Sequence, residues 1–201
     1  MATRLPPNVL HHPLSRGLGR RFFQGGLGLH LRSFVTTTKP QPSLNHNLKS
    51  VPLVLTADTA HAELLDFEIA AVDHHVDGLL MAPSFAIPRL LSRHKLRYAD
   101  IALWEIHEAF AAQVLANVAA LEKPDWIRDR VGLSSDFGPF PWDRVNPNGG
   151  SVAIGHPFAA TGARDLSQAV KELWAKPSGS LAIVSVCADG GHGTVALLRR
   201  P

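Results

Sequence analysis

Beyond residue 50, apolar positions recur with two different periods, and the pattern predicts strands and helices in turn. Short apolar runs, typical of buried strands, occupy residues 51–57, 100–106, 180–186 and 194–199. Apolar residues spaced three and four apart, typical of helices that bury one face, occupy residues 61–73, 82–94, 107–123 and a segment between Pro157 and Pro177. Strands that alternate with helices pair in parallel, and the last two strands are close enough for an antiparallel hairpin.

Glycine and proline interrupt this pattern at defined places. Residues 125–147 are rich in both and are predicted to form a long surface excursion. Residues 187–193 (CADGGHG) predict a tight glycine turn between the last two strands. Pro88 falls within the predicted helix over residues 82–94, where we expect proline to be tolerated only in the first turn.

The size and composition of the chain indicate a folded domain with an extension. The chain has 201 residues, of which 45% are hydrophobic and 18% charged. That length suits one domain of roughly 100–200 residues. No stretch approaches the roughly 20 apolar residues of a membrane-spanning helix, so we expect no transmembrane segment. The single cysteine, Cys187, excludes internal disulfides and any site that needs several cysteines.

Positive charge is concentrated at the amino terminus. Residues 1–57 contain seven basic and no acidic side chains, whereas the remainder carries a net charge of −4. The basic excess therefore belongs to this segment, and we expect no nucleic-acid binding. Residues 1–50 are predicted to be a disordered basic leader and linker, whose arginine-rich, acid-poor composition is typical of a mitochondrial transit peptide. The alternative is an amino terminus without a targeting role, which would leave the protein in the cytoplasm.

Three polar motifs lie where strands meet helices or turns, which is where α/β folds build their sites. They are WEIHEAF (104–110), NGGSVAIGHP (148–157) and CADGG (187–191). Each is weak by itself. A histidine before a proline is more often a cap or turn residue than a base, and a cysteine that ends an apolar strand is usually a small buried hydrophobe.

Taken together and in this order, the motifs resemble the carboxy-terminal half of the thiolase family. The matching segments are WEIHEAFAAQ (104–113), NPNGGSVAIGHPFAATGAR (146–164) and CADGGHG (187–193), with APSFAIPRLL (82–91) in support. The resemblance covers residues 79–199 and is greatest to 3-ketoacyl-CoA thiolases of the fatty-acid β-oxidation complex. It implies an α/β half-domain over residues 51–201, with a mixed sheet of about five strands flanked by helices.

The resemblance also implies a chemistry, which is acyl transfer between 3-ketoacyl-CoA and CoA through an acyl-cysteine. His156 would take the proton of the nucleophilic cysteine. Cys187 would act as the acid and base, and His107 with His156 would hold the enolate oxygen. A backbone N–H of the turn at Asp189 and Gly190 would serve a second oxyanion hole. Acyl-CoA and CoA are substrates, and no metal or redox cofactor is implied.

Two departures from the family pattern limit this inference. The family carries its nucleophilic cysteine in an amino-terminal half that this sequence does not match, and Cys187 is already assigned another role. We therefore expect a half-enzyme that forms an oligomer with a separately encoded amino-terminal half or with a full-length thiolase. Asp189 stands where the family has a small residue, and a carboxylate there would oppose the developing negative charge unless it points into solvent.

Two alternatives remain open. The chain could be an inactive thiolase fragment that acts only as an interaction module with a full-length thiolase. Metal binding is a weaker alternative, because His11–His12 and His74–His75 are adjacent pairs, and adjacent side chains point apart on regular elements.

The leader hypothesis predicts that residues 1–50 carry a fluorescent reporter into mitochondria when they are fused to its amino terminus. The physical basis is the excess of arginine without acidic residues. Confocal microscopy against a mitochondrial marker checks the prediction, and a diffuse cytosolic signal would remove it.

Overall fold

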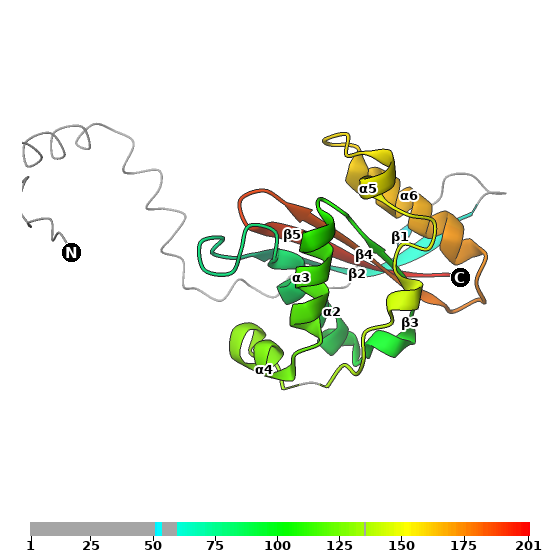
Figure 1. The fold of residues 1–201 in the computed structure, drawn as a ribbon. Helices are drawn as coiled ribbons and strands as arrows, with labels where there is room; N and C mark the ends of the chain where they lie inside the picture. Colours follow the sequence, from blue (N-terminus) through cyan, green and yellow to red (C-terminus); the bar gives the residue numbers. More distant parts are fainter. Residues whose placement is uncertain (1–50, 54–59, 135) are drawn as a thin grey trace, which may run out of the picture. The chain divides into compact units, whose positions relative to one another are not determined.

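The computed structural model describes residues 51–53, 60–134 and 136–201, and these include a five-stranded mixed sheet (Figure 1). The strand order is β1-β2-β5-β4-β3, in which β3 and β4 are parallel and the other neighbours antiparallel. The strands are β1 (Val51–Leu53), β2 (Ala62–Ala71), β3 (Ile101–Ile106), β4 (Leu181–Ala188) and β5 (His192–Arg199). The predicted α/β class with a mixed sheet of about five strands is confirmed.

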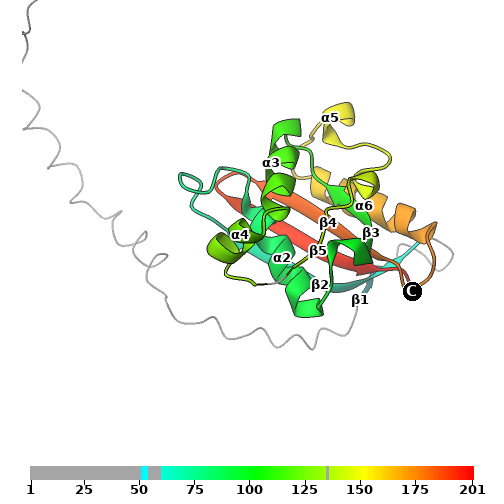
Figure 2. The same ribbon diagram turned by 60° about the horizontal axis from the view of Figure 1, so that its bottom comes forward.

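Helices cover both faces of this sheet (Figure 2). One face carries α2 (Ala82–His94) and, packed against it, α3 (Ala111–Leu121), α4 (Pro124–Trp126) and a π-helical turn (Ile127–Val131). The other carries α6 (Thr161–Trp174), preceded by the short α5 (Ser151–Ile154). Two 3₁₀ turns, Tyr98–Asp100 and Trp142–Arg144, complete the regular structure. None of the helices in these residues has the length and hydropathy to cross a bilayer.

The two faces bury separate apolar cores because successive residues of a strand point to opposite sides. In β3, Trp104 lies in the core under α2 and α3, whereas Leu103 lies in the core under α6. Both side chains are fully buried. The sheet is therefore the middle layer of a helix–sheet–helix sandwich, and α6 supplies most of one outer layer.

The helix predicted over residues 61–73 is wrong, because residues 62–71 form strand β2. Both faces of β2 are covered, so adjacent residues are apolar: Leu64 packs against the α6 core and Leu65 against the α2 core. A bulge between Leu64 and Asp66 also shifts the alternation. Together these effects reproduce the spacing of a helix in a strand that is partly covered on both faces.

The segment over residues 125–147 is more than a surface excursion. Ile127, Phe137 and Phe140 are at most 5% exposed and join the α2 core. Tyr98 stacks on Phe137 and donates its hydroxyl hydrogen bond to the carbonyl of Leu121. This segment, rich in glycine and proline, is therefore irregular in backbone but contributes aromatic side chains to the core.

Two helices differ from their predicted course. Pro88 lies inside α2 rather than in its first turn. Every residue of α2 from Ala82 to Pro88 is buried, and this packing offsets the missing backbone hydrogen bond, which costs about 3 kcal/mol in an exposed helix. Helix α3 begins at Ala111, four residues later than its predicted start at residue 107, because residues 107–110 form a turn. The predicted leader, residues 1–50, lies outside the described residues.

The α6 core predicts a stability difference between two leucines. Leu173→Ala removes a fully buried side chain and should lower the free energy of unfolding by about 2–5 kcal/mol. Leu115→Ala, at a leucine of α3 that is 58% exposed, is the matched control and should change it by less than about 0.5 kcal/mol. Urea unfolding followed by circular dichroism measures both, and equal effects would contradict the assignment of this core.

Candidate functional site

The sequence-predicted residues meet at the carboxyl ends of the two parallel strands. His107 directly follows β3, and Cys187 lies near the end of β4. The backbone N–H of His107 donates to the carbonyl of Ser185 at 2.8 Å, which extends the ladder between these strands by one residue. His156 arrives from the loop before α6. Parallel strands bring their carboxyl ends to one edge, so three residues distant in sequence become neighbours.

These residues line one cavity of about 670 Å³. His107, His156, Thr161, Cys187 and Asp189 contribute its polar groups. The rest of the wall is largely apolar and comes from Leu79, Leu80, Ala109, Phe110, Phe158, Ala159, Gly162, Val186 and Ala188. An apolar cavity with a few convergent polar groups is the usual form of a small-molecule site.

The two histidines are in contact. Their ring centroids are 4.4 Å apart and the rings are tilted by 46°. His107 is 1% exposed, whereas His156 is exposed and also lies against the ring of Phe158. The pair therefore presents two imidazoles, one deep and one near the surface, to the same cavity.

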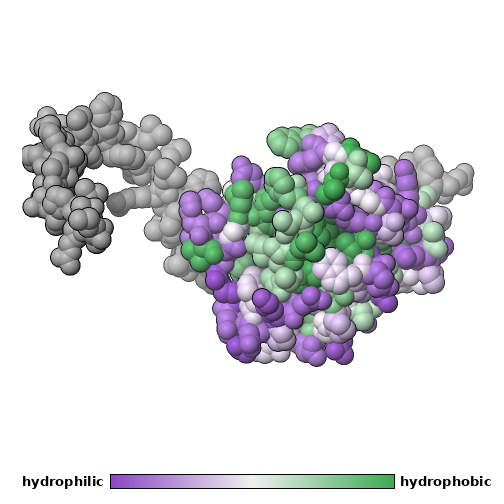
Figure 3. Space-filling view, in the orientation of Figure 1, coloured by the Kyte–Doolittle hydropathy of each residue, from purple (hydrophilic) through white to green (hydrophobic). Residues whose placement is uncertain are grey.

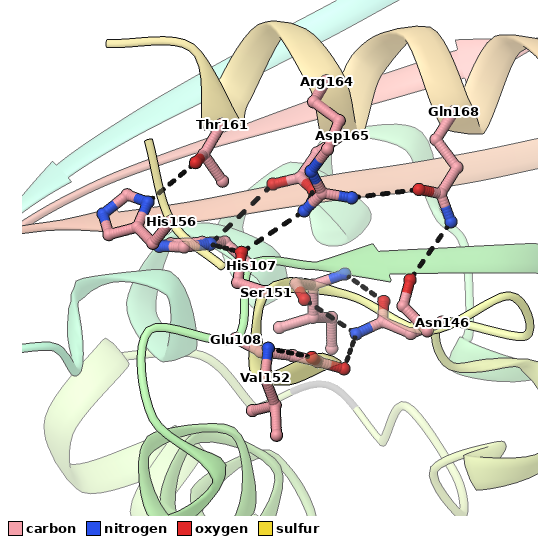
Figure 4. A network of polar contacts seen from close by, with 12 residues as sticks. His107, Glu108, Asn146, Ser151, Val152, His156, Thr161, Arg164, Asp165 and Gln168 are labelled. Carbon is pink, nitrogen blue, oxygen red and sulfur yellow. Dashed lines mark hydrogen bonds and ion pairs between the residues drawn. The ribbon is translucent and has the colours of Figure 1, made fainter. Parts of the chain in front are cut away.

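A hydroxyl group lies beside the Nδ1 atom of each ring (Figure 4). Nδ1 of His107 is 3.2 Å from Oγ of Ser151, and Nδ1 of His156 is 2.7 Å from Oγ1 of Thr161. Ser151 also accepts a hydrogen bond from Nη2 of Arg164 at 3.3 Å. The Thr161 hydroxyl donates to the backbone carbonyl of residue 157 at 3.1 Å.

Burial changes the protonation of His107 and Cys187. Loss of solvent, with smaller contributions from the nearby His156 and Arg164, lowers the pKa of His107 to about 4, so the imidazole is neutral at physiological pH. Loss of solvent raises the pKa of Cys187 to about 11, with a smaller contribution from Asp165. The Cys187 thiol therefore holds its proton and suits the role of an acid better than that of a nucleophile.

A charged pair lies directly behind the histidines. Asp165 is 2% exposed and forms an ion pair with Arg164, while its Oδ2 atom lies 4.0 Å from Nδ1 of His107. Burial raises the pKa of the Asp165 carboxyl. We did not assign Arg164, Asp165, Ser151 or Thr161 from the sequence, although all four lie within or next to the motif over residues 146–164. Their position in the same motif as His156 was the available signal.

The turn that carries His107 is held by a second polar network. Asn146 pairs with both backbone groups of Ile106, at 2.8 and 2.9 Å, and donates to Glu108 at 2.7 Å. Glu108 also accepts from the backbone N–H of Val152 at 3.0 Å. A Cβ atom at Gly150 would lie 2.7 Å from the Glu108 carboxylate, so a larger residue there would displace this carboxylate. The two motifs are therefore locked together behind His107.

The turn after Cys187 is where the resemblance places a backbone N–H donor of a second oxyanion hole. Asp189 is exposed and lines the cavity, but its Oδ1 atom accepts a hydrogen bond from the backbone N–H of Gly190 at 2.7 Å. The carboxylate thus occupies the N–H of Gly190, which is one of the backbone donors that this turn can offer to an oxyanion hole.

The part of the chain that the structure describes contains no cluster of potential metal ligands. No group of three or more His, Cys, Asp and Glu side chains in this part is arranged around a common point. His74 and His75 are exposed, with ring centroids 4.0 Å apart. His11 and His12 lie outside the described residues.

Comparison with known proteins gives a consistent result. A family profile described as thiolase, C-terminal domain, matches residues 58–200. A probable 3-ketoacyl-CoA thiolase of Caenorhabditis elegans is 37% identical over 170 residues, which cover 81% of this chain and 38% of that protein. The chain therefore spans less than half the length of this relative.

Two solved structures resemble the fold. Human mitochondrial 3-ketoacyl-CoA thiolase in complex with CoA gives a TM-score of 0.56 at 27% identity and covers 70% of this chain and 30% of its own. Peroxisomal 3-ketoacyl-CoA thiolase of Saccharomyces cerevisiae gives 0.55 at 30% identity and covers 70% and 34%. The yeast enzyme is described as a five-layered α-β-α-β-α structure constructed from two core domains of identical topology.

The raised pKa of Cys187 predicts slow alkylation of the native protein. Because the thiolate is the reactive form, the rate with iodoacetamide should still rise between pH 9 and 11 in the native chain. In urea it should level off near the ordinary cysteine pKa of about 8.5. Mass spectrometry gives both rates at a single site, because Cys187 is the only cysteine. A native rate that levels off below pH 9 would contradict the prediction.

Proposed function

This chain belongs to the thiolase family, and we propose that it serves in acyl transfer between 3-ketoacyl-CoA and CoA. The observation that carries the proposal is the meeting of His107, His156 and Cys187 in one apolar cavity. The CoA complex of the human relative supports CoA and acyl-CoA as the ligands of this cavity. No metal or redox cofactor enters the proposed reaction.

The proton transfers follow from the state of each group. His156 accepts the proton of the nucleophilic cysteine, whose sulfur then attacks the 3-keto carbon. Cleavage of the bond between carbons 2 and 3 leaves the acyl group on sulfur and an acetyl-CoA enolate. Cys187, protonated because its pKa is raised to about 11, gives its proton to that enolate. Its thiolate then takes the proton of CoA, whose sulfur attacks the acyl carbon to give acyl-CoA, and the nucleophilic cysteine leaves as a thiolate that recovers its proton from His156.

His107 stabilises the enolate rather than transferring a proton. The N–H of a neutral imidazole is a much weaker acid than that of an imidazolium. A neutral His107 therefore donates a hydrogen bond to the enolate oxygen and keeps its proton. Its pKa of about 4 keeps it neutral through the pH range of the reaction. A preorganised donor of this kind is worth roughly 2.7–4 kcal/mol in other acyl-transfer enzymes.

The nucleophile has to come from a partner segment. Cys187 is the one cysteine of the sequence and acts here as the acid and base. We propose that a separately encoded amino-terminal half, or a full-length thiolase, supplies the nucleophilic cysteine in an oligomer with this chain. The two-core architecture of the yeast neighbour supports this proposal, since two three-layered cores form five layers when they share one.

The shared layer would lie on the α5–α6 side. Among the described helices, α6 packs on this face, and the short α5 with the following loop exposes Val152 (65%), Ile154 (63%) and Phe158 (84%). Apolar surface near α5 continues towards α3 (Figure 3). Apolar side chains exposed to this degree next to a ligand cavity are typical of a surface that a partner covers.

The metabolic setting is also a proposal. Similarity to 3-ketoacyl-CoA thiolases supports a role in fatty-acid β-oxidation. The basic composition of residues 1–50 and the mitochondrial human relative support a mitochondrial location. The yeast neighbour is peroxisomal, so the reporter fusion of residues 1–50 is the measurement that decides between compartments.

One observation favours a second candidate function. The Asp189 carboxylate bonds to the backbone N–H of Gly190, which the catalytic proposal needs as an oxyanion donor. With this donor occupied, the chain would act as an interaction module that binds a full-length thiolase and adds no activity. Replacing Asp189 by Gly separates the two functions, because it should raise the activity of a catalytic assembly and leave an interaction module inactive.

The catalytic proposal predicts turnover only in an assembly. The purified chain should not thiolyse acetoacetyl-CoA or a longer 3-ketoacyl-CoA, and addition of a thiolase amino-terminal half should produce turnover. His156→Gln should lower that turnover by at least 10²-fold, whereas the exposed His75→Gln should not. Spectrophotometry of the 3-ketoacyl-CoA enolate follows the reaction.

Two outcomes would count against this assignment. Turnover by the chain alone that disappears in Cys187→Ala would make Cys187 the nucleophile. Co-purification with a full-length thiolase without any gain of activity would support the interaction module.

A further inference from the structure

The hydrogen bonds around the two histidines determine which nitrogen of each ring carries the proton. A neutral imidazole has one N–H donor and one acceptor nitrogen, and the partner of Nδ1 selects between the two forms. Both Nδ1 atoms face a hydroxyl, and a hydroxyl has a single proton to give. The destination of that proton therefore decides each tautomer.

The proton of the Thr161 hydroxyl has a backbone acceptor. This hydroxyl donates to the backbone carbonyl of residue 157 at 3.1 Å, so its oxygen can only accept at the 2.7 Å contact with Nδ1 of His156. The donor in that contact has to be the His156 N–H. His156 thus carries its proton on Nδ1 and keeps the lone pair of Nε2 free.

Ser151 is in the opposite situation. Nη2 of Arg164 donates to its oxygen at 3.3 Å, because a guanidinium has donors and no acceptor. The Ser151 proton is then free to donate to Nδ1 of His107, 3.2 Å away. His107 thus accepts at Nδ1 and carries its proton on Nε2.

The charges around His107 agree with a neutral ring. Asp165 is the acidic group nearest Nδ1, at 4.0 Å, which is too far for a hydrogen bond, and Arg164 pairs with its other oxygen. His156 and Arg164 disfavour a second proton on His107, and Glu108 only partly opposes them. A protonated His107, with donors at both nitrogens, would leave the Ser151 proton without its acceptor.

We propose that Thr161 and the Arg164–Ser151 pair hold the two histidines in opposite tautomers, His156 as Nδ1–H and His107 as Nε2–H. The rings point their other nitrogens away from these hydroxyls (Figure 4). The cavity then receives one proton acceptor, from His156, and one hydrogen-bond donor, from His107. Ser151, Thr161 and Arg164 are positioning residues, since they act through the histidines.

The catalytic meaning of this arrangement rests on the proposed function, but the tautomers do not. As a free acceptor, Nε2 of His156 suits removal of a proton from a thiol. As a fixed donor, Nε2–H of His107 suits an enolate oxygen. Either tautomer can be measured in the full chain without substrate or partner, so failure of the proposed function and failure of this proposal are distinguishable.

The test is long-range ¹H–¹⁵N NMR of the ¹⁵N-labelled full chain at pH 7. The pattern of couplings distinguishes a protonated ring nitrogen from one with a lone pair. His107→Gln and His156→Gln assign the two sets of signals. We expect protonated Nδ1 in His156 and protonated Nε2 in His107. The same tautomer in both rings, or the reverse assignment, would overturn the proposal in the wild-type protein.

Two variants test the positioning residues separately. Ser151→Ala should raise the Nδ1–H population of His107, because Asp165 remains close to that nitrogen, and should leave His156 unchanged. Thr161→Val should shift His156 towards Nε2–H and leave His107 unchanged. Ser151→Thr and Thr161→Ser keep each hydroxyl and should retain the wild-type tautomers. Ser167→Ala, elsewhere on α6, is the matched control. Ring spectra of Ser151→Ala and Thr161→Val identical to wild type would show that the hydroxyls do not select the tautomers.

Discussion

The parallel pairing of β3 with β4 is the constraint on which the rest of the site depends. Ile106 pairs with Ser185, and the next residue of β3, His107, still bonds to the Ser185 carbonyl at 2.8 Å. This register brings His107 to the strand end that carries Cys187. The crossover from β3 to β4 passes through α5 and α6, so the same connection delivers His156 to that edge. A parallel pair cannot be joined by a tight turn, and the long crossover it requires is what the chain uses to build its site.

Burial determines the chemistry of these groups once they have met. His107 and Cys187 are 1% and 6% exposed. Loss of water lowers the pKa of His107 and raises that of Cys187, and both shifts favour the neutral side chain. An ion pair between Arg164 and Asp165 lies behind them, in a place where either charge alone would be costly. Arg164 therefore serves two purposes, because it neutralises Asp165 and directs the Ser151 hydroxyl. The protein thus keeps a neutral His107 next to buried charges.

The surface around the cavity bears on the proposed assembly with a partner. The described residues form one helix–sheet–helix unit, while the yeast neighbour contains two cores of identical topology. Helices α2 and α3 lie on one side of the sheet, and on the α6 side the exposed Phe158 of the loop after α5 lines the cavity. The proposed partner, which would supply the nucleophilic cysteine, would therefore pack at this apolar edge of the cavity. Among the residues that line the cavity, the Asp189 carboxylate is the one that would oppose the proposed catalysis.

The sequence by itself determined the class of fold, the helix over residues 82–94, the strand over 100–106 and the presence of His107, His156 and Cys187 in three ordered motifs. Local periodicity and motif spacing are properties of neighbouring residues, so they can be recognised without a structure. Only the tertiary structure decided that residues 62–71 are a strand, because burial on both faces removes the alternation that would identify one. It also decided which hydroxyl lies beside each histidine. Ser151 and His107 are 44 residues apart in sequence, and no local pattern encodes a hydrogen bond between them.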